Sequence, residues 1–452
     1  MRSLFLVVCL LLVASSAPAQ VVEESLSRDP GPLDFIQGEG YEQWIFQALA
    51  GDALVGLDPK GEPVPRLANR FNLLKDGRIS FTLRSDVHFP DGSPLRPEDV
   101  LWTFQELLRN PKASPTKRAI FQGAAVGLDE GRLWIRSPKP PARLLMELAR
   151  VPIAQANHPE RGCGPFAFRQ EPGAWVFSRR NHFLNPQVEG IRFRLLADPG
   201  AVQSALQKGW LSIGAPMSRR QTEVPPTHRL ITQPMHAQQV VWSRLGPAPL
   251  RWLERWRKDA FPSQLLALNA RPSRGLWPET LGFKSQAIAI QGPLPKPAGP
   301  LTLLYVGGND TIEKLLLALR ERARQDGVDL RLQPLEEGLL MARLQKGDFQ
   351  LACATAIFDP HPWAVLEYLD PQGPMNFSGW SDARAQSLIP KLTEPGTAGW
   401  RTLQGHWAEH PAALPLLDIQ SVIWVDRRLQ VEPSVLGLYL HTPGAAGWRW
   451  LR

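Results

Sequence analysis

Cysteine is scarce in this sequence, with three among 452 residues. Cys9 lies inside an apolar run at the N-terminus, which leaves Cys163 and Cys353 for the rest of the chain. Two cysteines cannot build the disulfide framework that staples small exported domains. This count leaves two alternatives open. The cysteines form one disulfide bridge that closes a very long loop, or they are two buried free thiols.

Several catalytic motifs are also missing. The chain has no GxSxG, HExxH, GxxxxGK[ST] or GxGxxG segment, so neither a nucleophile elbow nor a phosphate-binding loop is indicated. The acidic pairs Glu98-Asp99 and Glu336-Glu337 lie at predicted helix starts, where capping and the helix dipole explain them. A pair of glycosidase carboxylates stays open, because its geometry is not visible in sequence. We therefore predict no catalytic residue.

Histidines are few and scattered. Among the nine, His406 and His410 form the one pair at the i, i+4 spacing of a helix. A metal site there needs a third ligand, and spacing alone suggests none. We therefore expect a surface pair, with no metal site and no cofactor.

Long basic runs are absent too. The formal net charge is +8, and the pairs Arg179-Arg180, Arg219-Arg220 and Arg427-Arg428 are isolated. Isolated pairs are typical of a solvated surface, so we predict no nucleic-acid partner.

An apolar run long enough to cross a membrane is not found after the N-terminus. The first 20 residues, MRSLFLVVCLLLVASSAPAQ, have the basic start, short apolar stretch and small-residue end of a secretory signal. Residues 1–19 are predicted to be a cleaved signal peptide, and the mature protein to be periplasmic. Cys9 follows Val8 inside the apolar run, which does not suit lipid attachment.

The remaining chain is long and apolar enough for two lobes. Hydrophobic residues make up 43% of the sequence, which argues against disorder, and about 430 mature residues exceed one ordinary core. Alternating residues predict a strand at 79–83, Asp91-Gly92 a turn, and Pro97 the start of an acid-capped helix. Further predicted elements are hairpins around 129–131 and 171–173, a helix near 250–258, an α/β unit (strands 301–306, 329–334 and 349–355; helices 311–325 and 336–345), helices 381–392 and 399–410, and strands within 414–425.

The segment around the predicted turn carries a family resemblance. Its elements are Phe81-Thr82-Leu83-Arg84, His88-Phe89-Pro90-Asp91-Gly92, Ser93-Pro94-Leu95 and Pro97-Glu98-Asp99-Val100. In this order they resemble the signature of bacterial extracellular solute-binding proteins of family 5, the peptide- and nickel-binding type that serves ABC importers. Arg96 stands where a capping Thr is usual, which predicts a weaker cap.

The resemblance extends along most of the mature chain. Gly162-Cys163-Gly164-Pro165-Phe166 is similar to the family's GTGPY strand start, and Asn376-Phe377-Ser378-Gly379-Trp380-Ser381 to its NYSGYS loop. Residues 240–290 fit worst, and the family's paired helices are expected to be compressed into Leu250–Leu276.

The resemblance implies an α/β, two-lobed periplasmic-binding-protein fold, type II-like, with an extra subdomain in the first lobe and a ligand cleft between the lobes. We expect a first lobe of residues 20–240 with 418–452, which includes the subdomain at about 45–155, and a second lobe of residues 241–417. Crossing strands are expected near 236–244 and 414–424. Because Cys163 and Cys353 then fall in different lobes, where a bridge would pin the hinge, we predict two free thiols.

The resemblance also implies a function. We expect a monomeric, non-enzymatic protein that captures a small solute, most often a short peptide, and delivers it to an ABC permease in the inner membrane. In peptide-binding members an Asp after the strand predicted at 349–355 holds the ligand's amino terminus, which points to Asp359, although a simple capping role stays open. The candidate ligand-binding residues are Asp359, Phe358, Trp363, Asn376, Trp380, Phe46 and Gln47. A ligand-sensing or scaffold derivative without transport, and an exported hydrolase, are the alternatives.

Overall fold

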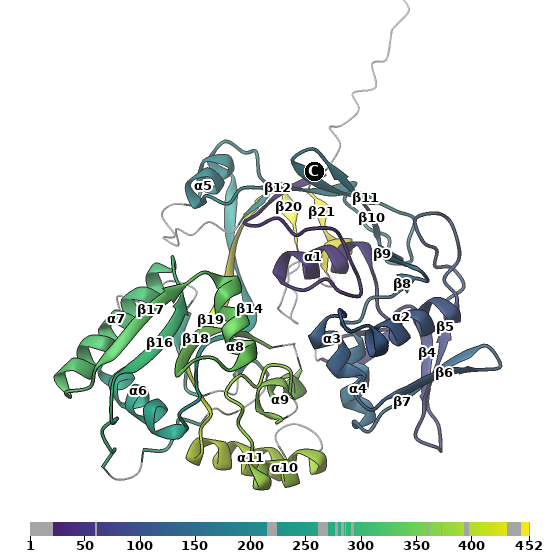
Figure 1. The fold of residues 1–452 in the computed structure, drawn as a ribbon. Helices are drawn as coiled ribbons and strands as arrows, with labels where there is room; N and C mark the ends of the chain where they lie inside the picture. Colours follow the sequence, from purple (N-terminus) through teal and green to yellow (C-terminus); the bar gives the residue numbers. More distant parts are fainter. Residues whose placement is uncertain are drawn as a thin grey trace, which may run out of the picture.

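Two long antiparallel strands, β14 (His228–Ser243) and β19 (Ala413–Asp426), run through the centre of the protein and join its two lobes (Figure 1). They belong to an eleven-stranded sheet of order β10-β11-β12-β1-β13-β19-β14-β18-β16-β17, with β15 also paired to β19. The computed structural model describes residues 21–451 except 59–60, 215–223, 261–269, 276–278, 282–283, 285, 291–292, 359–360, 372, 393–396 and 432–443. The predicted signal peptide and Asp359 lie outside the described residues.

The sheet is narrow between the lobes. On one side, β13 (Ile213–Gly214) pairs with β19 at Val425 and Trp424. On the other, β18 pairs with β14 from Ala237 onward. Between these points, among the described strands, residues 231–234 of β14 and 420–423 of β19 pair with each other alone.

The first lobe contains one end of the large sheet and a smaller four-stranded sheet of order β4-β5-β7-β6. Its strands are β1 (Val21–Leu26), β2 (Val55–Leu57), β3 (Pro63–Pro65), β4 (Ala68–Leu73), β5 (Ile79–Leu83), β6 (Ala125–Asp129), β7 (Arg132–Arg136), β8 (Ala154–Gln155), β9 (His158–Gly162), β10 (Phe166–Glu171), β11 (Ala174–Arg179) and β12 (Gly190–Leu195). Its helices are α1 (Tyr41–Ala50), α2 (Pro97–Arg109), α3 (Pro115–Ile120), α4 (Pro141–Leu148) and α5 (Pro199–Gln207). Near the C-terminus, β20 (Leu429–Gln430) pairs with β21 (Arg449–Trp450), and η6 (Gly444–Gly447) precedes β21.

The second lobe contains the other end of the sheet. Its elements are α6 (Pro247–Ala260), β15 (Ala270–Pro272), η3 (Glu279–Leu281), β16 (Leu301–Val306), α7 (Asp310–Gln325), β17 (Leu330–Leu335), α8 (Glu337–Lys346), β18 (Leu351–Ile357), η4 (Pro362–Val365), α9 (Leu366–Leu369), α10 (Ala383–Leu388), η5 (Ile389–Lys391) and α11 (Ala398–Glu409). Strand β16 pairs in parallel with both β17 and β18, so the α/β unit predicted from the sequence is confirmed.

The signature segment folds as its residues predict. Strand β5 and helix α2 begin where expected, and Val100, Phe104 and Leu107 are buried on one face of α2. Arg96 provides no side-chain cap, but the carboxylate of Asp99 accepts from the backbone N–H groups of Arg96 and Ala156, each at 2.9 Å. The acid therefore fixes the helix start from inside its first turn, which offsets the missing capping Thr.

The prediction that the family's paired helices are compressed into residues 250–276 is wrong at the C-terminal end of that segment. Helix α6 is present and longer than predicted, but Ala270–Pro272 form strand β15 on β19. Residues 261–269 lie outside the described residues. A three-residue strand carries almost no periodicity, so its pairing depends on the exposed edge of β19 rather than on local sequence.

Gly164 permits a close approach of two backbone segments. A Cβ at this position would lie 2.5 Å from the carbonyl oxygen of Gly51 and 2.6 Å from its nitrogen. The backbone N–H of Gly164 donates to the carbonyl of Ala50 at 2.8 Å. The residues after β9 thus dock directly on the end of α1, which explains a Gly in the GCGPF element on steric grounds.

The two cysteines are free and buried, as predicted. Cys163 belongs to the core of the subdomain and Cys353 to the core of the second lobe. Burial raises the pKa of the Cys163 thiol and raises that of Cys353 to about 12. Thiolate, the reactive form, is therefore suppressed at neutral pH.

We expect equal intact masses for the oxidised and reduced protein. Iodoacetamide should label neither cysteine in the native protein within minutes at pH 8 and both after denaturation in urea, because only unfolding exposes them. The masses are read by electrospray mass spectrometry. A loss of two hydrogens without reductant, or rapid native labelling, would contradict this expectation.

Candidate functional site

The two lobes touch through charged and apolar contacts on the side where α1, α3 and α4 face α8 and α9 (Figure 1). Arg28 pairs with Glu337 at 2.6 Å, and Arg150 with Glu367 at 2.5 Å. The Glu367 carboxylate is largely shielded, at 12% exposure, whereas both partners of the first pair are half exposed. Met146 of α4 packs against the core of the second lobe. The lobes therefore meet at two separate places on this side of the molecule.

A buried carboxylate organises α4 for this contact. Glu147 is 3% exposed and accepts from Lys139 at 2.6 Å and from Arg143 at 2.8 Å. Burial opposes ionisation, but the two cations outweigh it and lower the pKa of Glu147. Arg143 in turn lies over the ring of Trp363 in the second lobe, 5.7 Å from its centroid. The interlobe contact of Arg143 is thus held in place by an acid inside the first lobe.

Two of the predicted site residues, Phe46 and Gln47, lie inside the first lobe. Phe46 is fully buried among four aromatic rings, with Phe177 nearest at 4.8 Å. The Gln47 amide donates to the carbonyls of Asp34 (2.7 Å) and Gly38 (3.1 Å). These contacts are those of core residues, and a ligand role for either stays a prediction.

The Gln47 side chain also reaches a buried lysine. Its oxygen accepts from Lys117, 2.7 Å away, and Lys117 donates as well to the carbonyl of Phe35 at 2.8 Å. Burial lowers the pKa of Lys117 to about 8. Gln47 therefore helps to satisfy a cation beneath α1 and α3.

Phe358 and Trp363 flank Asp359 in the sequence, and both belong to the buried core of the second lobe. Phe358 is fully buried and packs on Tyr368 at 4.9 Å between ring centroids. Trp363 is 4% exposed, meets Trp400 edge-on at 5.1 Å and faces Arg143 of the first lobe. Of the predicted residues with described side chains, Trp363 is the one that takes part in an interlobe contact given above.

Asn376 and Trp380 are brought together by a turn. The Asn376 amide donates to the carbonyl of Trp380 at 2.7 Å, and its oxygen accepts from the Trp380 backbone N–H at 3.1 Å. Asn376 therefore closes the loop that resembles NYSGYS. Its side-chain hydrogen bonds to the loop backbone account for an Asn here, and ligand contact stays a prediction.

A cavity of about 710 Å³, lined mostly by charged and polar residues, lies between α6, β15 and β19. Arg257 pairs with Glu254 at 2.6 Å, and Asp418 accepts from Gln238 at 2.8 Å. Burial raises the pKa of Asp418 in spite of this hydrogen bond. The cavity is therefore lined by charges of both signs, and both members of the Glu254–Arg257 pair come from α6.

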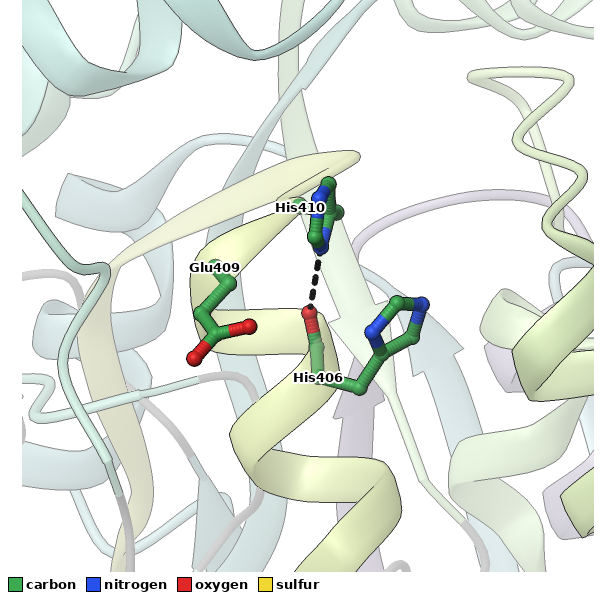
Figure 2. Close-up of side chains that lie close together, drawn as sticks. All are labelled: His406, Glu409 and His410. Atoms are coloured by element: carbon green, nitrogen blue, oxygen red, sulfur yellow. Dashed lines mark hydrogen bonds between the residues drawn. The ribbon is translucent and has the colours of Figure 1, made fainter.

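The expectation that His406 and His410 are a surface pair is wrong for His406. This ring is 7% exposed, and Glu409 supplies the third group that the spacing of histidines alone did not suggest (Figure 2). The signal in the sequence is the H-x-x-E-H order of residues 406–410, which is the reverse of the HExxH motif.

Sequence analysis did not identify Arg28, Arg143, Arg150, Glu337 or Glu367. The two bridging ion pairs join residues 309 and 217 positions apart, so no local motif marks them. Among the described helices, none is both long and apolar enough to cross a bilayer.

Residues 62–227 match the family described as bacterial extracellular solute-binding proteins, family 5 Middle. The whole fold is similar to a periplasmic binding protein, DppA, from Helicobacter pylori in complex with the peptide STSA, with a TM-score of 0.79, 15% identity and coverage of 96% of this chain and 98% of that one. It is also similar to the ABC transporter substrate-binding protein CtaP from Listeria monocytogenes, with a TM-score of 0.78, 16% identity and coverage of 96% and 99%. This chain has the fold of the family 5 solute-binding proteins.

The resemblance to family 5 and the two-lobed α/β fold predicted from the sequence are thereby confirmed. A curated relative, the probable deoxycholate-binding periplasmic protein YgiS of Escherichia coli (strain K12), is 34% identical over 102 residues. That match covers 22% of this chain and 19% of the relative's length. The similarity to family 5 therefore shows the fold of this chain and does not identify its solute.

Proposed function

We propose that this protein is an exported, non-enzymatic solute-binding protein that captures a short peptide between its two lobes and delivers it to an ABC permease. The observation that carries the proposal is the junction itself, where two lobes are joined by a narrow pair of strands and held together by a few ion pairs. Such an arrangement suits hinge closure around a ligand. In this proposal residues 1–19 are removed on export, and the protein acts as a periplasmic monomer.

The proposed lobe boundaries follow the earlier expectation, with residues 20–240 and 418–452 in the first lobe and 241–417 in the second. The distribution of buried residues supports this division, because one core runs from Val240 to Leu417 and the others use residues outside that range. Peptide as the solute is supported by the similar Helicobacter pylori protein, which is described in complex with one.

Two other functions differ from the proposal in their observable consequences. An exported hydrolase would turn over its substrate, and a sensing or scaffold derivative would bind a solute without a transport partner. The match to a probable deoxycholate-binding protein makes a bile acid a further solute to test.

Peptide binding is expected to stabilise the mature protein without turnover. Synthetic di- to pentapeptides at a hundredfold excess over Kd should add about 2.7 kcal/mol to the free energy of unfolding. Differential scanning fluorimetry measures the stabilisation, and chromatography measures peptide cleavage. Intrinsic fluorescence should shift as well, because Trp363 lies in the contact between lobes. If deoxycholate stabilises the protein and no peptide does, the solute is a bile acid and not a peptide. Cleavage of the peptide would favour the hydrolase.

Asp359→Asn provides the site-specific arm of this experiment. A carboxylate in a closed cleft would form a charge-assisted bond with the ligand's amino terminus, so this variant should bind the same peptide at least tenfold more weakly. Its melting temperature without peptide should stay close to that of the parent. Full affinity, or a large loss of stability without peptide, would return Asp359 to a capping role.

A further inference from the structure

The C-terminal end of α11 brings together three side chains with metal-ligating atoms. His406, Glu409 and His410 each place one such atom within 4.8 Å of those of the other two (Figure 2). The two imidazole rings lie 4.7 Å apart between centroids, and Glu409 extends from the same last turn of the helix. This cluster lies in the second lobe, on an element that makes none of the interlobe contacts described above.

The proton positions on His406 follow from its surroundings. Its Nε2 lies 2.7 Å from Asp382 Oδ1. The Asp382 Oδ1 atom also accepts from the backbone N–H of Ala385 at 2.9 Å, as the cap of α10, so it acts as a hydrogen-bond acceptor here. Nε2 therefore donates, and in the neutral ring Nδ1 carries the lone pair. Among the described residues, Nδ1 has no hydrogen-bond partner although it is buried.

This arrangement is the one that metal-binding histidines use. A ligating imidazole commonly donates its other N–H to a carboxylate, which fixes the ring and makes the free nitrogen a better ligand. His406 has that carboxylate in Asp382, and its unpartnered nitrogen lies on the side of Glu409 in Figure 2. A buried acceptor without a partner costs free energy, and a bound cation would remove that cost.

The other two side chains can adjust to an ion. Glu409 and His410 are exposed at the helix end, so they can turn without disturbing the core. His410 Nδ1 lies 3.2 Å from the carbonyl oxygen of His406, which leaves the lone pair of the neutral ring on Nε2. Two ligands on one zinc ion lie at most about 4.2 Å apart, so Glu409 and His410 would have to rotate toward His406 to bind the same ion.

We propose that His406, Glu409 and His410 bind one divalent transition-metal ion of the zinc, nickel and copper class, with Asp382 as the residue that positions His406. Two imidazoles and one carboxylate suit these ions better than Mg²⁺ or Ca²⁺, which prefer oxygen ligands. The fourth position is left for water. None of these four residues is among the candidate peptide-binding residues, so the proposal does not depend on the peptide site.

The test uses the mature, untagged protein after dialysis against EDTA, because a histidine tag would bind the same ions. Isothermal titration with zinc chloride at pH 7.5 should show one ion per chain. His410→Ala should weaken binding at least tenfold, and since this residue is exposed, the variant should keep its fold. Asp382→Asn should weaken binding by about 10–100-fold, the usual effect of losing such a partner.

A matched control is available in another histidine beside a carboxylate. His158 lies 3.4 Å from Glu160 on the surface of the first lobe. His158→Ala should bind zinc as the parent does, whereas His406→Ala should lose the site. Circular dichroism of the metal-free variants verifies their folding. Absence of zinc binding in the parent, or equal binding by the His410→Ala and His158→Ala proteins, would overturn the proposal.

Discussion

Glu147→Gln is expected to lower the free energy of unfolding by about 3–5 kcal/mol, the usual cost of removing one partner from a buried ion pair. Glu147 is 3% exposed and holds both Lys139 and Arg143, so the variant leaves two shielded cations without their counter-charge. Urea denaturation at pH 7, followed by circular dichroism, gives the change. Glu321→Gln, which removes one partner of the exposed Arg324 pair on α7, is the control and should change stability little.

The pH dependence provides a second measurement of the same interaction. Because the folded state lowers the pKa of Glu147 below its ordinary value of 4.5, the stabilisation is present above about pH 4.5. It is lost as the pH falls through the lower, folded-state pKa. The difference between parent and Glu147→Gln should therefore be constant near neutrality and shrink in acid. A difference below about 1 kcal/mol at pH 7 would mean that the cations find other partners.

Trp242→Ala is expected to cost a similar amount, about 3–5 kcal/mol, as large-to-small changes in cores do. Trp242 is 1% exposed on β14, between Ala352 of β18 and Ala413 of β19. Its ring meets Phe377 edge-on at 5.3 Å. The two alanines leave space that this indole fills, so the variant would contain a cavity in the middle of the sheet.

Trp210→Ala is the control for this variant. Trp210 is 65% exposed and lies under the ammonium group of Lys208, 4.7 Å from the ring centroid. We expect a loss of at most about 1 kcal/mol, because an exposed cation–π contact contributes only about 0.5–1 kcal/mol. Equal losses for the two tryptophans, measured by urea denaturation, would contradict the packing role given to Trp242.

The signature segment was predictable because its determinants are local. Alternation fixes β5, a Gly after Asp91 permits the turn at φ 85°, and Pro97 with Asp99 starts α2. The same holds for the hairpin at Glu130-Gly131, where both residues have positive φ. Each of these structures depends on neighbours within a few positions.

The site was less predictable because its contacts are not local. Sequence indicates that Phe46 is apolar, but whether it faces a core or a ligand depends on strands more than 100 positions away. Arg143 and Glu147 stand at a helical spacing that predicts pairing, yet spacing does not reveal that Glu147 is buried or that Arg143 reaches Trp363. The predicted exposure of His406 is wrong for the same reason, because packing decides which face of the helix is buried.

The narrow part of the central sheet has a mechanical consequence. Among the described strands, β14 and β19 pair with each other alone between the lobes, so the sheet is a two-stranded ribbon at this point. Two-stranded ribbons twist more strongly than wide sheets. The pairing of β14 with β19 also has a register shift between Pro234 and Ala237, and His236 within this shift has φ 40°. We therefore expect the lobes to move by rotation about the axis of this ribbon, mainly at the register shift. We do not expect packed faces to slide past each other. A torsional joint has a low stiffness in rotation and a high one in stretch, so the lobes can turn while their separation stays nearly constant.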